Sequence, residues 1–98
     1  MSAQGGAVTV FAPAGELTMV SAPAVLEDGR RLARAGDQVV DFAGVTVADS
    51  AALALLLDWM RCAREAGNRL AVRSLPAGMA SLAALYDIDS LLPLEPAQ

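Results

Sequence analysis

The chain has 98 residues, a length that allows one domain and argues against two. Hydrophobic residues make up 55% of it and charged residues 18%, which argues against disorder and leaves apolar side chains for a partner. The net charge is −4, and the only cluster of basic residues is formed by Arg30, Arg31 and Arg34, which we interpret as a solvated helix face. This balance argues against a nucleic-acid partner. Histidine is absent, which removes His-based catalysis and most zinc sites.

The chain begins with signals for a strand followed by a helix. Residues 7–12 are β-rich and predict the first strand. Gly15 then indicates a turn or a close backbone approach. Thr18 or Ser21 can cap a helix that we expect to end near Ala35.

The pattern of strand and helix then repeats. Residues 38–43 predict a buried strand, and residues 44–48 predict the connection after it. A helix is expected over residues 50–66, a third strand over 70–73 and a third helix over 77–85. Strands that alternate with helices are typical of βαβ units and a mainly parallel sheet.

The sequence also predicts how the chain is organised and where it resides. We expect a single domain over residues 1–98, with flexible ends at 1–6 and 94–98. We expect no signal peptide, and the longest apolar run, residues 51–57, is too short to span a bilayer. Cys62 is the only cysteine, so no disulfide can form within the chain. These features predict a cytoplasmic protein.

The helix over residues 50–66 supplies most of the expected core. Cys62 stands in its apolar part, with no base near it in the sequence, and we interpret it as a small core residue. Gly29, in the first helix, is expected to weaken that helix by about 1 kcal/mol relative to Ala. Further core residues expected from the second helix are Leu53, Leu56, Leu57, Trp59 and Met60.

Asp49 and Ser50 stand where a short apolar strand region gives way to an apolar helix. One interpretation is that either residue caps the helix, which contributes about 1 kcal/mol. The other is functional, because the unpaired N–H groups at a helix start favour negative charge, including a phosphate on Ser50. Without phosphate, Ser50 followed by Ala51 and Ala52 forms a flat patch that a partner backbone can approach closely. The local pattern is compatible with both interpretations.

No other group of residues predicts chemistry. Asp49 and Asp58 are nine residues apart, more than two helical turns, and so do not form a carboxylate pair. Asp87 and Asp89 lie in a loop without further metal ligands. We therefore expect no catalytic residue, no metal and no cofactor.

Three segments resemble a STAS domain: GELT at 15–18, VVDFAGVTVADSAALALLL at 39–57 and GNRLAV at 67–72. A fourth, SLAALYDIDSLLP at 81–93, is similar to the small stand-alone STAS subunits of bacterial phospholipid ABC transporters. The resemblance implies an α/β fold in which a mixed, mostly parallel sheet carries helices packed mainly on one face.

The resemblance also implies a role. It implies a non-enzymatic regulatory and assembly subunit that binds the transporter's ATPase, and through it the permease and the substrate-binding subunit, at the cytoplasmic side of the inner membrane. Direct membrane insertion and a small-molecule substrate are not expected. Ser50 is then the hydroxyl at the partner interface, preceded by Asp49, and helical spacing adds Ala51, Ala54 and Asp58 to the same face. The alternative role is an anti-sigma factor antagonist that is switched by phosphorylation of Ser50.

Overall fold

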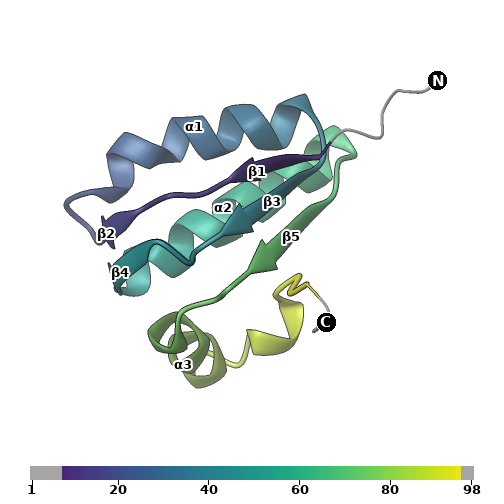
Figure 1. Ribbon diagram of the computed structural model, residues 1–98. Coiled ribbons are helices and arrows are strands. Elements are labelled where there is room, and N and C mark those ends of the chain that lie inside the picture. The colour runs from purple at the N-terminus through teal and green to yellow at the C-terminus, as the bar shows by residue number, and fades with distance from the viewer. Residues whose placement is uncertain (1–7, 96–98) are drawn as a thin grey trace.

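The computed structural model describes residues 8–95, so the ends at 1–6 and 96–98, for which we expected flexibility, lie outside the described residues. The described chain alternates strands with helices, as Figure 1 shows. Its elements are β1 (Thr9–Phe11), β2 (Gly15–Leu17), α1 (Ala22–Ala35), β3 (Gln38–Asp41), β4 (Val45–Ala48), α2 (Ser50–Ala66), β5 (Leu70–Arg73), α3 (Ala77–Leu85) and the short 3₁₀ helix η2 (Asp89–Leu91).

The main sheet has the strand order β1-β3-β5, with β3 in the centre. Val10 of β1 is opposite Val39 of β3, which is opposite Ala71 of β5. Every strand pairing within residues 8–95 is parallel. The structure thus confirms the expected α/β fold, and the limits of α2, β5 and α3 agree with those predicted.

Strand β2 begins at Gly15, where the sequence indicated a turn or a close backbone approach, and the connection expected over residues 44–48 contains a second short strand, β4. They pair in parallel with each other beyond the ends of β1 and β3 (Figure 1). Gly15 adopts φ 81°, and its N–H donates to the carbonyl of Gly44 at 2.9 Å, so the chain bends and then resumes pairing. Strands of three and four residues are stabilised by each other and carry little local signal of their own.

Helices α1 and α2 lie against each other and cover one face of the sheet. Trp59 of α2 is fully buried, and its ring meets Phe11 of β1 edge to face, with the centroids 5.4 Å apart. The indole N–H of Trp59 donates to the carbonyl of Leu26 in α1 at 3.0 Å. A Cβ on Gly29 would overlap the indole, so this glycine lets α1 approach α2 closely. The packing of the two helices therefore requires glycine at position 29. The sequence alone predicts only that Gly29 weakens α1.

The core contains most of the α2 residues that the sequence predicted. Leu53, Leu56, Trp59 and Cys62 are buried, and Met60 packs against them partly exposed. The prediction for Leu57 was wrong, because its side chain faces outward and is 37% exposed. The reason is that α2 contacts neighbours over only part of its circumference, and Leu57 lies on the remaining face.

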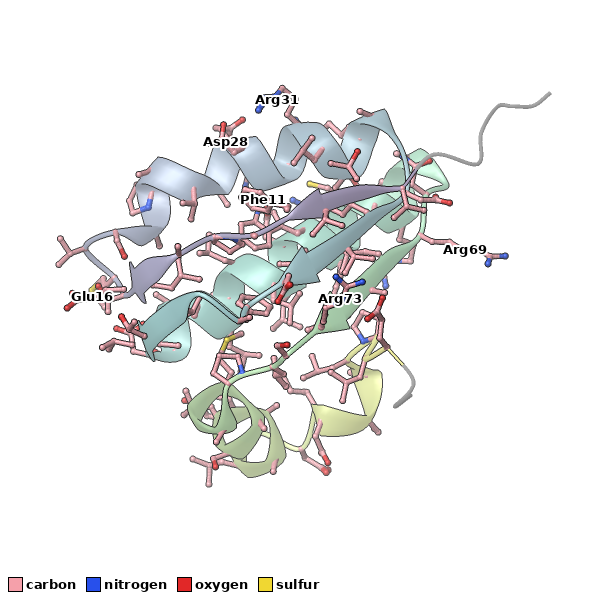
Figure 2. The ribbon with its side chains drawn as sticks, viewed as in Figure 1. Phe11, Glu16, Asp28, Arg31, Arg69 and Arg73 are labelled. Atoms are coloured by element: carbon pink, nitrogen blue, oxygen red, sulfur yellow. The ribbon has the colours of Figure 1, made fainter. Side chains whose placement is uncertain are left out.

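The C-terminal segment is tied to β5. The N–H of Val72 donates to the carbonyl of Pro93, and the N–H of Glu95 donates to the carbonyl of Val72, both at 2.8 Å. Arg73 forms an ion pair with Glu95, and Figure 2 shows Arg73 in front of the sheet. Residues 94 and 95, which belong to the end expected from the sequence to be flexible, thus pair with β5. Among the described residues, no helix has the length and apolar character needed to cross a membrane.

Candidate functional site

The start of α2 is capped by Asp49, which settles the choice that the sequence left open between Asp49 and Ser50. Asp49 has an extended backbone conformation, and its Oδ1 accepts a hydrogen bond from the N–H of Ala51 at 2.8 Å. Its own N–H donates to the carbonyl of Leu17 at 3.3 Å, which joins the helix start to the end of β2. The cap therefore fixes where α2 begins relative to the strand that precedes α1.

The second carboxylate oxygen of Asp49 holds the loop between β2 and α1. Its Oδ2 accepts a hydrogen bond from the N–H of Met19 at 3.3 Å. This loop presents two apolar side chains to solvent, Met19 at 77% and Val20 at 91% exposure. Asp49 thus positions these exposed apolar side chains beside the start of α2.

Ser50 is the first residue of α2 and is exposed. Within residues 8–95 its hydroxyl donates and accepts no hydrogen bond, because Asp49 satisfies the cap. The hydroxyl is consequently available to a group outside the chain, at the end of a helix whose dipole favours negative charge.

Ala51, Ala54 and Asp58 follow on the same face of α2 and line a groove between α1 and α2. The groove has a volume of about 390 Å³ and apolar walls. The structure therefore brings three of the five predicted site residues into one hollow, with Asp49 and Ser50 at its end. The opposite wall comes from Met19, Ala22, Pro23, Leu26 and Arg30, which the sequence did not assign to the site.

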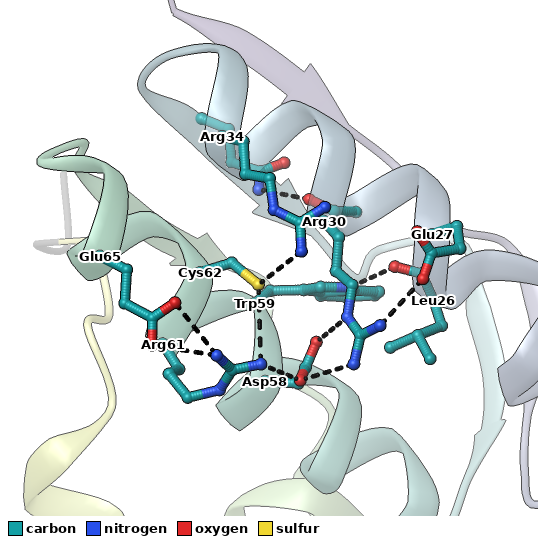
Figure 3. A network of polar contacts seen from close by, with 11 residues as sticks. Leu26, Glu27, Arg30, Arg34, Asp58, Trp59, Arg61, Cys62 and Glu65 are labelled. Atoms are coloured by element: carbon teal, nitrogen blue, oxygen red, sulfur yellow. Dashed lines mark hydrogen bonds and ion pairs between the residues drawn. The ribbon is translucent and has the colours of Figure 1, made fainter.

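Asp58 is held inside an ion-pair network rather than presented to solvent alone (Figure 3). Its Oδ2 accepts from Nε of Arg30 at 2.7 Å and its Oδ1 from Nη2 of the same residue at 3.0 Å, which ties α1 to α2. Arg61 donates to Oδ1 at 2.8 Å. The hydrogen bonds from Arg30 are the main reason that the pKa of Asp58 lies below its ordinary value. Arg61 lowers this pKa further, whereas desolvation of the carboxylate raises it in part.

Arg30 departs from the solvated helix face that we expected for the three arginines. Its side chain is 27% exposed and binds Glu27 at 2.9 Å in addition to Asp58. Arg31, in contrast, is 65% exposed and pairs with Asp28 on the outer side of α1, where Figure 2 shows both side chains pointing away from the molecule. Periodicity did not reveal the difference, because the partner of Arg30 lies 28 residues away.

The described residues contain no group of three or more His, Cys, Asp or Glu side chains that could hold a metal ion. Cys62 is a buried free cysteine, as predicted, and is not available to a substrate. The arrangement around Asp49 and Ser50 offers an unengaged hydroxyl, exposed apolar side chains and a groove. These are features of a binding surface.

Known families and structures match this chain over nearly its whole length. The family model described as "Mlab, STAS domain" matches residues 2–93. A structure of the anti-sigma factor antagonist SpoIIAA in its unphosphorylated form is similar, with a TM-score of 0.67 over 93% of this chain and 81% of that chain. The two sequences are 14% identical, so this similarity concerns the fold alone. No curated protein sequence matches the chain.

Proposed function

The chain belongs to the STAS domain family, whose members are generally non-enzymatic regulatory domains, and we propose that it is an MlaB-like subunit of a phospholipid ABC transporter. In this role it binds the ATPase subunit MlaF, supports its assembly and activity, and reaches the permease MlaE and the lipid-binding MlaD indirectly. It would then lie in the cytoplasm, peripheral to the inner membrane, and serve the lipid asymmetry of the outer membrane.

The observation that carries this proposal is the start of α2. A hydroxyl without a partner in the described chain, on Ser50, lies between a loop with two exposed apolar side chains and an apolar groove. Exposed apolar side chains beside a polar group and an apolar groove suit contact with a protein partner. The family description, which names Mlab, supports the choice of a transporter partner.

Each of the five residues has a role in this surface. Ser50 is the central contact, and Ala51 and Ala54 keep the adjacent helix face low so that the partner backbone can approach. Asp49 positions the helix start and the loop through its two hydrogen bonds. Asp58 joins the two walls of the groove through Arg30 and contacts the partner at its edge.

The test is Ser50→Arg in the full chain, co-expressed with the ATPase subunit. The long cationic side chain would obstruct the surface, so we expect loss of co-purification and of the stimulated ATP hydrolysis. Ala66→Arg is the matched control, because Ala66 is exposed at the other end of α2, about 24 Å away along the helix. Normal complex formation and hydrolysis by Ser50→Arg would contradict the interface.

A second candidate function is an anti-sigma factor antagonist, which the geometry of Ser50 favours. Phosphorylation would place about −1.5 to −2 charge units at the helix start, where the dipole stabilises negative charge. The carboxylate of Asp49, next to it in sequence, opposes this addition. Intact mass of the protein from cells, with and without phosphatase treatment, decides the matter: a phosphorylated fraction on Ser50 that releases a partner kinase supports this role, and its absence in every growth condition contradicts it.

A further inference from the structure

The groove between α1 and α2 is apolar along its length and charged along one rim. Its apolar lining comes from Met19, Ala22, Pro23, Leu26, Ala51, Ala54 and Leu55. Met19 and Ala54 are exposed, so the hollow opens at the surface and is accessible to a side chain carried by another protein. A volume of about 390 Å³ is enough for a large apolar side chain and its neighbours in a partner segment.

The network in Figure 3 is balanced in charge, with carboxylates on Glu27, Asp58 and Glu65 and guanidinium groups on Arg30, Arg34 and Arg61. Close to the groove itself, Asp58 and Glu27 share the single guanidinium of Arg30. The carboxylate of Asp49 lies at the other end, beside Met19. A segment that enters this groove is therefore favoured when it carries basic side chains.

Glu27 is the group on this rim that is best placed to meet a basic residue. Its side chain is 70% exposed, and only its Oε2 is used, by Nη1 of Arg30 at 2.9 Å. The other oxygen, Oε1, has no hydrogen-bond partner within the described range of the chain. The neighbouring acid Asp28 is also exposed but pairs with Arg31 on the outer side of α1, away from the groove.

We propose that the groove receives an apolar side chain of the ATPase subunit, carried on a basic segment whose Lys or Arg pairs with Glu27. The inference rests on the proposed function and extends it, because it names the chemistry of the partner segment. In this arrangement Ser50 contacts the partner at one end of the groove and Glu27 contacts it at the rim. The Arg30–Asp58 ion pair keeps the two walls at a fixed separation.

The apolar part of the proposal is tested by filling the groove. Ala54→Phe places a ring in the hollow, and we expect it to weaken binding of the purified ATPase subunit by at least about tenfold, ~1.4 kcal/mol. Ala66→Phe adds the same ring at the exposed far end of α2 and is expected to leave binding unchanged. Met19→Ser, in the exposed loop, removes apolar contact without adding volume and is expected to weaken binding as well.

The charged part is tested with Glu27→Gln, which removes the carboxylate but keeps the size of the side chain. We expect weaker binding and a smaller loss of affinity as the salt concentration rises, because an ion pair with the partner is lost. Asp28→Asn is the matched control on the adjacent position and is expected to leave both quantities unchanged. Tighter binding by Glu27→Gln would overturn a basic occupant.

The outcomes separate this inference from the proposed function. If Ser50→Arg abolishes binding while folded Ala54→Phe and Met19→Ser bind like the parent protein, the groove inference fails and the proposed function stands. If the parent protein does not bind the ATPase subunit at all, both fail. A dimer of this chain that Ala54→Phe dissociates would assign the groove to a second copy and overturn the inference.

Discussion

The carboxylate of Asp49 holds the backbone of Met19, with 3.3 Å between Oδ2 and the N–H nitrogen, while its other oxygen caps α2. One side chain thus positions a helix start and an exposed apolar loop that are 30 residues apart in sequence. The cap and the candidate binding surface are therefore parts of one structure, in which Asp49 positions the surface and Ser50 is left available to a partner.

Removal of this carboxylate should affect both stability and the loop. We expect Asp49→Ala to lower the free energy of unfolding by about 1 kcal/mol, the usual cost of losing a side-chain cap. In a domain of this size that corresponds to a melting temperature lower by about 4–8 °C. Hydrogen exchange should also show faster exchange at the amide of Met19. Asp49→Asn keeps the acceptor oxygen for the cap, so a loss equal to that of Asp49→Ala would contradict the role of the hydrogen bond.

Ser50 should behave differently from its neighbour. We expect Ser50→Ala to leave the free energy of unfolding unchanged within a few tenths of a kcal/mol, because its hydroxyl bonds to no described residue and Ala favours helix. Urea denaturation measures the difference. Destabilisation as large as that of Asp49→Ala would mean that the hydroxyl has a structural partner within the chain.

The packing of Gly29 against Trp59 gives a third prediction. A Cβ at Gly29 would overlap the indole, so Gly29→Ala forces the helices apart at a cost of about 1–3 kcal/mol. Most of this range exceeds the gain of about 1 kcal/mol in helix propensity, so we expect net destabilisation in thermal melts. Gly36→Ala is the control, because Gly36 has extended backbone and open space where a Cβ would lie. A more stable Gly29→Ala would show that α1 can move away from Trp59 freely.

The ion pair of Asp58 with Arg30 predicts a dependence of stability on pH. Because the pKa of Asp58 is lower in the folded chain than in the unfolded chain, its contribution is present above the unfolded pKa of about 3.9. It is lost as the pH falls through the lower, folded value. We expect Asp58→Asn to unfold at a lower temperature than the parent protein at pH 7.

The same comparison at acid pH provides the check. The difference in melting temperature between the parent protein and Asp58→Asn should shrink as the pH falls below about 3.9, because the parent then loses the charge as well. Asp28→Asn, which disturbs an exposed pair on the outer side of α1, should have a smaller effect at pH 7. A difference that stays constant down to the acid limit would contradict a charge-based role for Asp58.

The sequence by itself determined the elements whose signals are local. The limits of α2 follow from Asp49 before its first residue and from Gly67, in a left-handed conformation, after its last residue. Both signals are adjacent in sequence to the helix that they delimit. The buried position of Cys62 follows from the apolar periodicity of that helix. The family follows from motifs spread along the chain, and the family match over residues 2–93 confirms it.

Only the tertiary structure decided which elements distant in sequence contact each other. The strands β2 and β4 are stabilised by hydrogen bonds to each other, and neither is long enough to be predicted from its own sequence. The groove, the pairing of Asp58 with Arg30 and the contact of Gly29 with Trp59 all join α1 to α2, across about 30 residues of sequence. The periodicity of a sequence shows which side of a helix is apolar. Which residue of another helix packs against that side depends on how the two helices cross, and this is not encoded in the local sequence.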